Sequence, residues 1–214
     1  MIKYFIIIII FISTLPSLGQ SKKDNSASRL TINPSIKAEV EKNISPSQFG
    51  AGQDKFLIYN NRMLLDFYEN DTLNISLKEQ DNKSTVFKSF YYWKGDTLGI
   101  DGAYGLFGGA GFSIKFIKGQ ASLYHMLASD EFTTYAYKEN DSLIFRLEVP
   151  CTDTKIVLSE VPDPTTKQVI YGFVEFKSAD YYTMSGSADG QELLPRKKQR
   201  ANMRIYFKSA KLDL

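Results

Sequence analysis

Hydrophobic and polar positions alternate in short runs along most of this chain. From about residue 54 onward, these runs are repeatedly interrupted by Gly, Asn, Asp, Ser or Pro. A period of two places apolar side chains on one face of an extended strand, so each run indicates a strand. The run at 63–68 also fits a helical period. The strands that this pattern predicts lie at 56–59, 63–68, 73–77, 85–93, 112–117, 122–127, 132–137, 143–149, 155–158, 169–176, 181–184 and 201–208.

The turn residues between the runs predict how the strands are joined. An aromatic residue, a polar turn, a hydroxyl residue and then Leu recur at 68–73, 93–98 and 137–143. Asn, Asp and Gly at the centre of these repeats tolerate the positive φ that tight hairpins require. We therefore expect an all-β fold, either an antiparallel β-sandwich or a meander barrel of about ten short strands.

The first 19 residues have the pattern of a secretory signal peptide. Lys3 precedes an Ile-rich run, and Ser17 and Gly19 are the small residues that a signal peptidase needs. We predict cleavage between Gly19 and Gln20, with export to the periplasm or the extracellular space. The alternative is a retained membrane anchor, which requires about 20 apolar residues, whereas this run is interrupted sooner.

Residues 20–53 form a polar segment rich in Ser, Lys, Asn, Gln and Asp. We predict a polar leader or linker here, poorly ordered over residues 20–30, because too few apolar side chains are available to bury. Short apolar patches at 30–32 and 36–40 suit a strand or a helical turn. A single β-rich domain follows over 54–214, and no segment of the mature chain is apolar enough to span a membrane.

Charge and cysteine content narrow the classes of partner. Without Lys3, 25 Lys and Arg side chains face 24 Asp and Glu side chains. This balance gives no reason to expect nucleic acid as a partner. Cys151 is the only cysteine, so no disulfide can form within the chain, and its place at the end of an apolar strand face predicts burial. A reactive thiol is the alternative interpretation.

The segment from Gly99 to Gly111 holds six glycines in thirteen residues. A phosphate-binding loop would require a helix directly afterwards, but an alternating strand pattern begins at Phe112. We therefore expect a glycine-rich hairpin or a sharply bent strand pair in which backbone approaches backbone. The alternative is a mobile flap over a cavity, with Tyr104, Phe107 and Phe112 as its apolar wall.

Aromatic residues are the main candidates for ligand contact. In the run 90–93 both strand faces carry aromatic side chains, so one face enters the core and the other meets a second layer, a ligand or water. Tyr135 and Tyr137 form a second pair that we expect to point outward. The residues that we predict to bind a ligand are Tyr91, Trp93, Tyr104, Phe107, Phe112 and His125.

His125 is the single histidine, and Leu123 and Leu127 share its strand face. A packed, hydrogen-bonded histidine is the simpler interpretation, since a zinc site would need further donors that the pattern does not supply. We expect no metal and no cofactor. The alternative is a hydrolase or lyase acting on glycans through carboxylates such as Asp101, Asp130 or Glu131, with His125 assisting.

One basic cluster, residues 195–200 with Arg204 beyond it, lies between two predicted strands. A solvated loop is the simpler interpretation, and docking to an anionic glycan or lipid headgroup is the alternative. We predict an exported, non-catalytic binding or surface-interaction domain with an aromatic-lined cavity or face. Its expected partner is an apolar small molecule, a glycan or an envelope protein.

Overall fold

A computed structural model describes residues 30–47, 57–77, 86–105, 109–129, 133–186 and 193–213. It contains one helix, α1 (Ile36–Asn43), and a sheet of fourteen strands within these ranges. The strands are β1 (Leu30–Ile32), β2 (Ile44–Pro46), β3 (Leu57–Asn61), β4 (Met63–Glu69), β5 (Thr72–Leu77), β6 (Val86–Lys94), β7 (Thr97–Tyr104), β8 (Gly109–Ile117), β9 (Gln120–Ala128), β10 (Thr133–Ala136), β11 (Arg146–Leu158), β12 (Ile170–Ser178), β13 (Tyr181–Ser185) and β14 (Lys197–Lys211).

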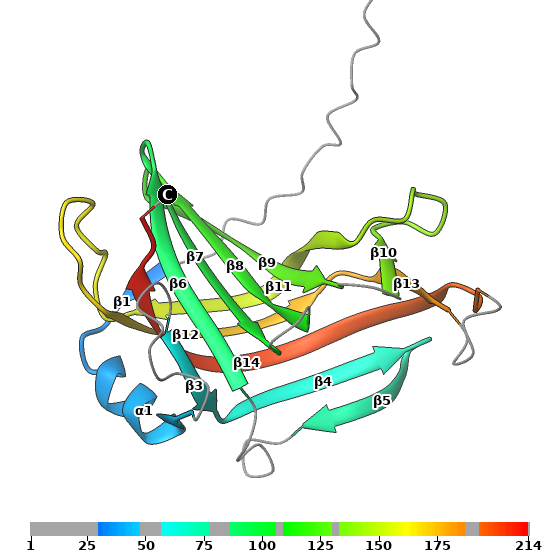
Figure 1. Cartoon of the computed structure of the whole chain (residues 1–214), viewed down its shortest axis with the longest axis horizontal. Helices are drawn as coiled ribbons and strands as arrows, with labels where there is room; N and C mark the ends of the chain where they lie inside the picture. The colour runs from blue at the N-terminus through cyan, green and yellow to red at the C-terminus, as the bar shows by residue number, and fades with distance from the viewer. Residues whose placement is uncertain are drawn as a thin grey trace, which may run out of the picture.

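The predicted all-β, antiparallel fold is confirmed (Figure 1). The main path of the sheet runs β10-β13-β14-β12-β11-β9-β8-β7-β6-β3-β2. The described strands outnumber the ten that we expected, and two of them are long: β11 has 13 residues and β14 has 15. The segment 63–68, which also fitted a helix, is a strand. Among the described residues, no helix has the length and apolar character needed to cross a membrane.

The longest strand, β14, pairs with four others along its length. It is antiparallel to β12, β13 and β4, and its last residues run parallel to β6. Side chains at alternate positions are buried, from Ala201 to Ser209, while those between them are half-exposed. This strict period of two gives β14 one inner and one outer face from Ala201 to Ser209.

The sheet curves until its C-terminal strand meets β6 (Figure 1). Ala210 and Lys211 pair with Phe90 and Tyr91, and the amide of Leu212 donates to the carbonyl of Tyr91 at 2.7 Å. The buried hydroxyls of Ser89 and Ser209 also hydrogen-bond across this junction. These contacts hold the two strands together at one end of the sheet.

The main core fills the inner face of the curved sheet. The ring of Phe112 on β8 lies 4.9 Å from that of Phe207 on β14 and 6.2 Å from that of Phe87 on β6. All three side chains are fully buried. Strands far apart in the sequence therefore meet through aromatic contacts, which dominate core energetics because each ring buries a large area.

A smaller cluster lies on the outer face, under the helix. Ile36 and Val40 of α1 pack against Val157 of β11 and Phe173 of β12. The structure places β1 and α1 at the two apolar patches, 30–32 and 36–40, where we expected a strand or a helical turn, and β1 pairs with β11 in parallel. Residues 1–29 lie outside the described residues, so the signal peptide and the beginning of the leader stay predictions.

The predicted hairpin turns are confirmed at two of the repeats. Asn70 and Asp71 both have positive φ, 47° and 63°, between β4 and β5. Gly95, with φ of 60°, begins the two-residue turn between β6 and β7. The third repeat forms an irregular turn in which the amide of Asp141 donates to the carbonyl of Lys138 at 3.0 Å.

The glycine-rich segment forms the antiparallel pair of β7 and β8. A Cβ atom on Gly111 would lie 1.9 Å from the carbonyl oxygen of Gly102, and one on Gly102 would lie 2.6 Å from the Phe112 ring. Glycine is required at both positions because neighbouring backbone or aromatic atoms occupy the space of a side chain. The expected close approach is confirmed, while residues 106–108 lie outside the described ranges.

We predict that Gly111→Ala lowers the free energy of unfolding by about 3 kcal/mol, because a fixed backbone carbonyl obstructs the new methyl group. Urea denaturation measures this loss as a lower midpoint. Ser122→Ala, at a half-buried position of the adjacent strand β9, serves as the control and changes stability by no more than about 0.5 kcal/mol. Equal midpoints for Gly111→Ala and the unmodified protein would contradict the packing described here.

Candidate functional site

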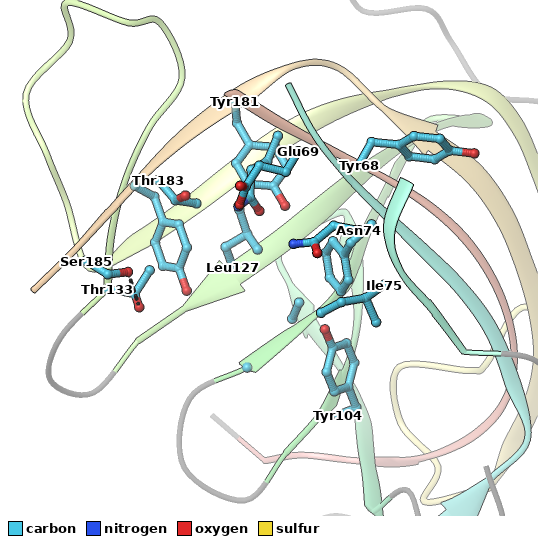
Figure 2. A pocket seen from close by; sticks show the side chains of 15 residues that line it. Tyr68, Glu69, Asn74, Ile75, Tyr104, Leu127, Thr133, Tyr181, Thr183 and Ser185 are labelled. Atoms are coloured by element: carbon cyan, nitrogen blue, oxygen red, sulfur yellow. Dashed lines mark hydrogen bonds between the residues drawn. The ribbon is translucent and has the colours of Figure 1, made fainter. Parts of the chain in front are cut away.

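The sheet has an opening opposite the junction of β6 with β14. β3 pairs with β6, and β4 pairs with β14. The chain bends at Arg62, between β3 and β4, so at this end of the sheet the partner of β14 is β4 and not β6. A pocket of about 310 Å³ lies here, bordered by eight strands (Figure 2). Its lining residues are Phe67, Tyr68, Glu69, Asn74, Ile75, Tyr104, Gly109, Ala110, Leu127, Thr133, Tyr135, Tyr181, Thr183, Ser185 and Gln199.

Three tyrosines from three strands line this pocket. Tyr104 ends β7, Tyr135 lies on β10 and Tyr181 begins β13. Tyr104 and Tyr181 extend from different walls of the pocket (Figure 2). Burial raises the pKa of all three phenols, and the mutual proximity of the rings raises those of Tyr104 and Tyr181 further. All three therefore remain neutral hydroxyl donors at physiological pH.

No hydrogen bond joins these three hydroxyls to any residue that the structure describes. Buried polar groups are normally paired, and a neutral phenol can donate one hydrogen bond and accept others. The pocket thus presents three donors whose partners must come from water or from a ligand.

The remaining lining divides into an apolar wall and a polar rim. Phe67, Ile75, Ala110 and Leu127 form the apolar part. Glu69 brings the one carboxylate, and its charge is matched because Lys197 lies 2.9 Å from it, while the amide of Gln199 donates to it at 3.4 Å. The hydroxyls of Thr133 and Ser185 bond to each other at 3.1 Å. Among the described lining residues, charge is therefore balanced.

Of the six predicted ligand-binding residues, Tyr104 lines this pocket. Tyr91 is fully buried in the core, where its hydroxyl donates to the carbonyl of Gln168 at 3.0 Å, and Phe112 is buried against Phe207. Trp93 is half-buried near the turn between β6 and β7, away from the pocket. Phe107 lies outside the described residues.

The sixth predicted residue, His125, is fully buried directly behind the pocket wall. Its ring centroid lies 5.6 Å from that of Tyr181 and 6.3 Å from that of Phe67. Nδ1 is 3.0 Å from the carbonyl oxygen of Gly111, which can only accept, so Nδ1 carries the proton. Nε2 is then an unprotonated nitrogen with no partner among the described residues. Desolvation lowers the pKa of His125 to about 4.

Asp101, the one carboxylate of the alternative enzymatic hypothesis that the structure describes, does not lie beside His125. Gly102 pairs with Phe112, and Phe112 pairs with His125, so these three residues share one face of the sheet. Asp101 is next to Gly102 on β7 and therefore points to the opposite face from His125. Asp130 and Glu131 lie outside the described residues. Within the described part of the chain, no three His, Cys, Asp or Glu side chains are arranged to hold a metal ion.

The thiol of Cys151 is buried, as its strand position predicted. Its Sγ atom lies 3.7 Å from the carbonyl oxygen of Val149, and burial raises the pKa of the thiol. At physiological pH this thiol is protonated and packed in the core.

Sequence reasoning missed Tyr135 and Tyr181 as pocket residues. We expected Tyr135 to point outward, but it is 8% exposed and lines the pocket, because β10 pairs with β13, a strand distant in the sequence. Tyr181, Thr183 and Ser185 share one strand face, and this period of two was the available signal. The sequence pattern did not show which strands lie across the pocket from this face.

Comparison with known proteins adds no assignment: no protein-family model, no curated protein and no solved structure matches this chain.

We predict that stability falls in mild acid through His125. Its pKa is depressed in the folded state, so the unfolded state binds a proton first as the pH drops below about 6.5. This contribution is fully present above pH 6.5 and is lost as the pH falls toward about 4. The free energy of unfolding falls by up to about 3 kcal/mol over this window.

Urea unfolding at a series of pH values measures this loss. His125→Asn is the control, since its amide replaces the Nδ1 donor and does not titrate. Carboxylates contribute equally in both proteins, so the difference between the two pH profiles isolates His125. Parallel profiles between pH 6.5 and 4 would show that the buried, neutral state is wrong.

Proposed function

We propose that this protein is an exported, non-catalytic binding domain whose pocket holds a small, uncharged molecule with an apolar body and hydrogen-bond acceptors. One observation carries the proposal: Tyr104, Tyr135 and Tyr181 bring neutral, unpaired hydroxyls to a pocket of about 310 Å³. Pockets of this size are typical of small-molecule sites, in which a few placed polar groups orient a mostly apolar ligand.

The ligand's charge follows from the lining. A charged ligand would lose its hydration without gaining an ion pair in the pocket, because Lys197 and Glu69 already neutralise each other. The ligand's acceptors follow from the phenols, which donate when they are neutral. The apolar body follows from Phe67, Ile75 and Leu127, where burial of apolar surface contributes about 25 cal/mol per Å².

We predict that the neutral fluorescent ketone Prodan binds in this pocket and that Tyr104→Phe weakens its binding by roughly two- to tenfold, the effect of one lost neutral hydrogen bond. Fluorescence titration measures the dissociation constant. Tyr91→Phe is the matched control, because the Tyr91 phenol bonds to Gln168 in the core and does not line the pocket.

A second pair of variants locates the probe. Ile75 lines the pocket and is 48% exposed, whereas Leu73 on the same strand is 49% exposed and does not line it. Ile75→Trp narrows the pocket and reduces Prodan binding, and Leu73→Trp leaves it unchanged. Absence of saturable binding, or equal effects of the two tryptophans, would refute the proposed site.

Export is the second part of the proposal. It is supported by the short apolar run after Lys3 and by the small residues before Gln20. We predict that mass spectrometry of the protein isolated from its own cells finds Gln20 as the first residue, outside the cytoplasm. Recovery of the chain with Met1 intact in the membrane fraction would favour the retained anchor instead.

A further inference from the structure

A second hollow lies on the outer face of the sheet, where β12 ends beside β14. It has a volume of about 500 Å³. Tyr68, Thr152, Lys177, Ser178, Asp180 and Arg200 contribute to its lining. Arg200 and Gln199 are adjacent on β14, so they point to opposite faces, and Tyr68 is the one described residue that lines both this hollow and the pocket that Gln199 lines.

Two irregularities of the sheet create this hollow. On one side of β14 the partner changes from β12, where Lys177 pairs with Asn202, to β13, where Tyr181 pairs with Gln199. Between these pairs, the amide of Ala201 donates a hydrogen bond to the side-chain hydroxyl of Ser178 at 2.8 Å, in place of a bond to a backbone carbonyl. On β11 the register shifts between Thr152 and Lys155. Such bulges often re-aim side chains beside binding sites.

Arg200 is the cation in this hollow that forms no ion pair with a described residue. Its guanidinium lies over the ring of Tyr68, its antiparallel partner on β4, at 4.6 Å from the ring centroid. Nε is buried without a hydrogen-bond partner, and no ion pair joins the Arg200 guanidinium to the rest of the described chain. The terminal nitrogens also form no hydrogen bond with the described residues, so they can take an acceptor from a ligand.

The other cations of the neighbourhood are already paired. Lys177 lies 2.9 Å from Asp153, and Lys198 lies 2.7 Å from Asp71 and 3.6 Å from Asp180. The basic cluster predicted from the sequence is thus mostly neutralised within the molecule. Of the three cations, Arg200 alone forms no ion pair with a described residue, and the nearby Asp180 disfavours a ligand that carries two negative charges.

We propose that Arg200 binds a single carboxylate of a polar small molecule in this hollow. The two terminal nitrogens of a guanidinium match the two oxygens of a carboxylate in a bidentate pair. Hydroxyl and amide groups of Thr152, Ser178 and Asn202 line the rest of the hollow and suit a hydroxylated body. A sugar acid combines these two features, and D-glucuronate serves as the probe.

The test follows the Nε–Hε resonance of Arg200 by NMR while D-glucuronate is added to the whole protein at constant ionic strength. The expected result is a saturable shift with D-glucuronate and none with D-glucose, which has the same ring without the carboxylate. Inorganic phosphate, mostly a dianion at neutral pH, binds more weakly. A signal that does not shift with D-glucuronate, a shift with D-glucose, or tighter binding of phosphate would overturn the proposal.

Calorimetry of variants supplies the second readout. Arg200→Gln weakens D-glucuronate binding by about tenfold or more. Arg200→Lys also weakens binding, because lysine keeps the positive charge but cannot donate two parallel hydrogen bonds to one carboxylate. The control is Arg204→Gln, on the same face of β14, whose guanidinium already bonds to Glu175 at 2.8 Å; it leaves binding unchanged. Equal affinity of Arg200→Gln and the unmodified protein would refute the site. Prodan binding to the inner pocket reports separately on the proposed function.

Discussion

The sharing of one strand between different partners determines the shape of this sheet. β14 runs antiparallel to β12 over most of its length, pairs with β4 and β13 at its beginning and meets β6 at its end. Each change of partner has a local cause in the chain: the bend at Arg62 between β3 and β4, and the short connection between β12 and β13. Between these changes, from Ala201 to Ser209, buried and half-exposed side chains alternate without a break, so this part of the strand keeps one face in the core.

Both hollows lie where β14 changes partner, which links the fold to the proposed binding. On the inner face, β4 and β6 do not stay side by side, and three phenols face the resulting pocket without a partner in the described structure. On the outer face, β12 gives way to β13, and Arg200 is left without an acceptor. His125 lies behind the inner pocket as a neutral, packed ring, so its place in the molecule is structural support for the wall that Tyr181 and Phe67 form.

Local patterns predicted local structure well. The period of two identified the long strands, the turn chemistry at Asn70 and Asp71 identified a hairpin, and the glycines predicted close approach of β7 and β8. The candidate site was harder to predict, because a pattern shows which residues share a face but not which strands lie opposite. Tyr91 and Phe112 have strong aromatic patterns and belong to the core, whereas Tyr135 reaches the pocket through a pairing between β10 and β13 that is distant in sequence.

The central role of β14 is tested most directly by amide hydrogen exchange at single-residue resolution. Strand sharing predicts that the amides from Ala201 to Phe207 exchange only when the whole molecule unfolds, so their opening free energies equal that of global unfolding. If these amides instead exchange through local opening, with free energies well below those of β7 and β8, the sheet is not organised around β14 and this account of both hollows fails.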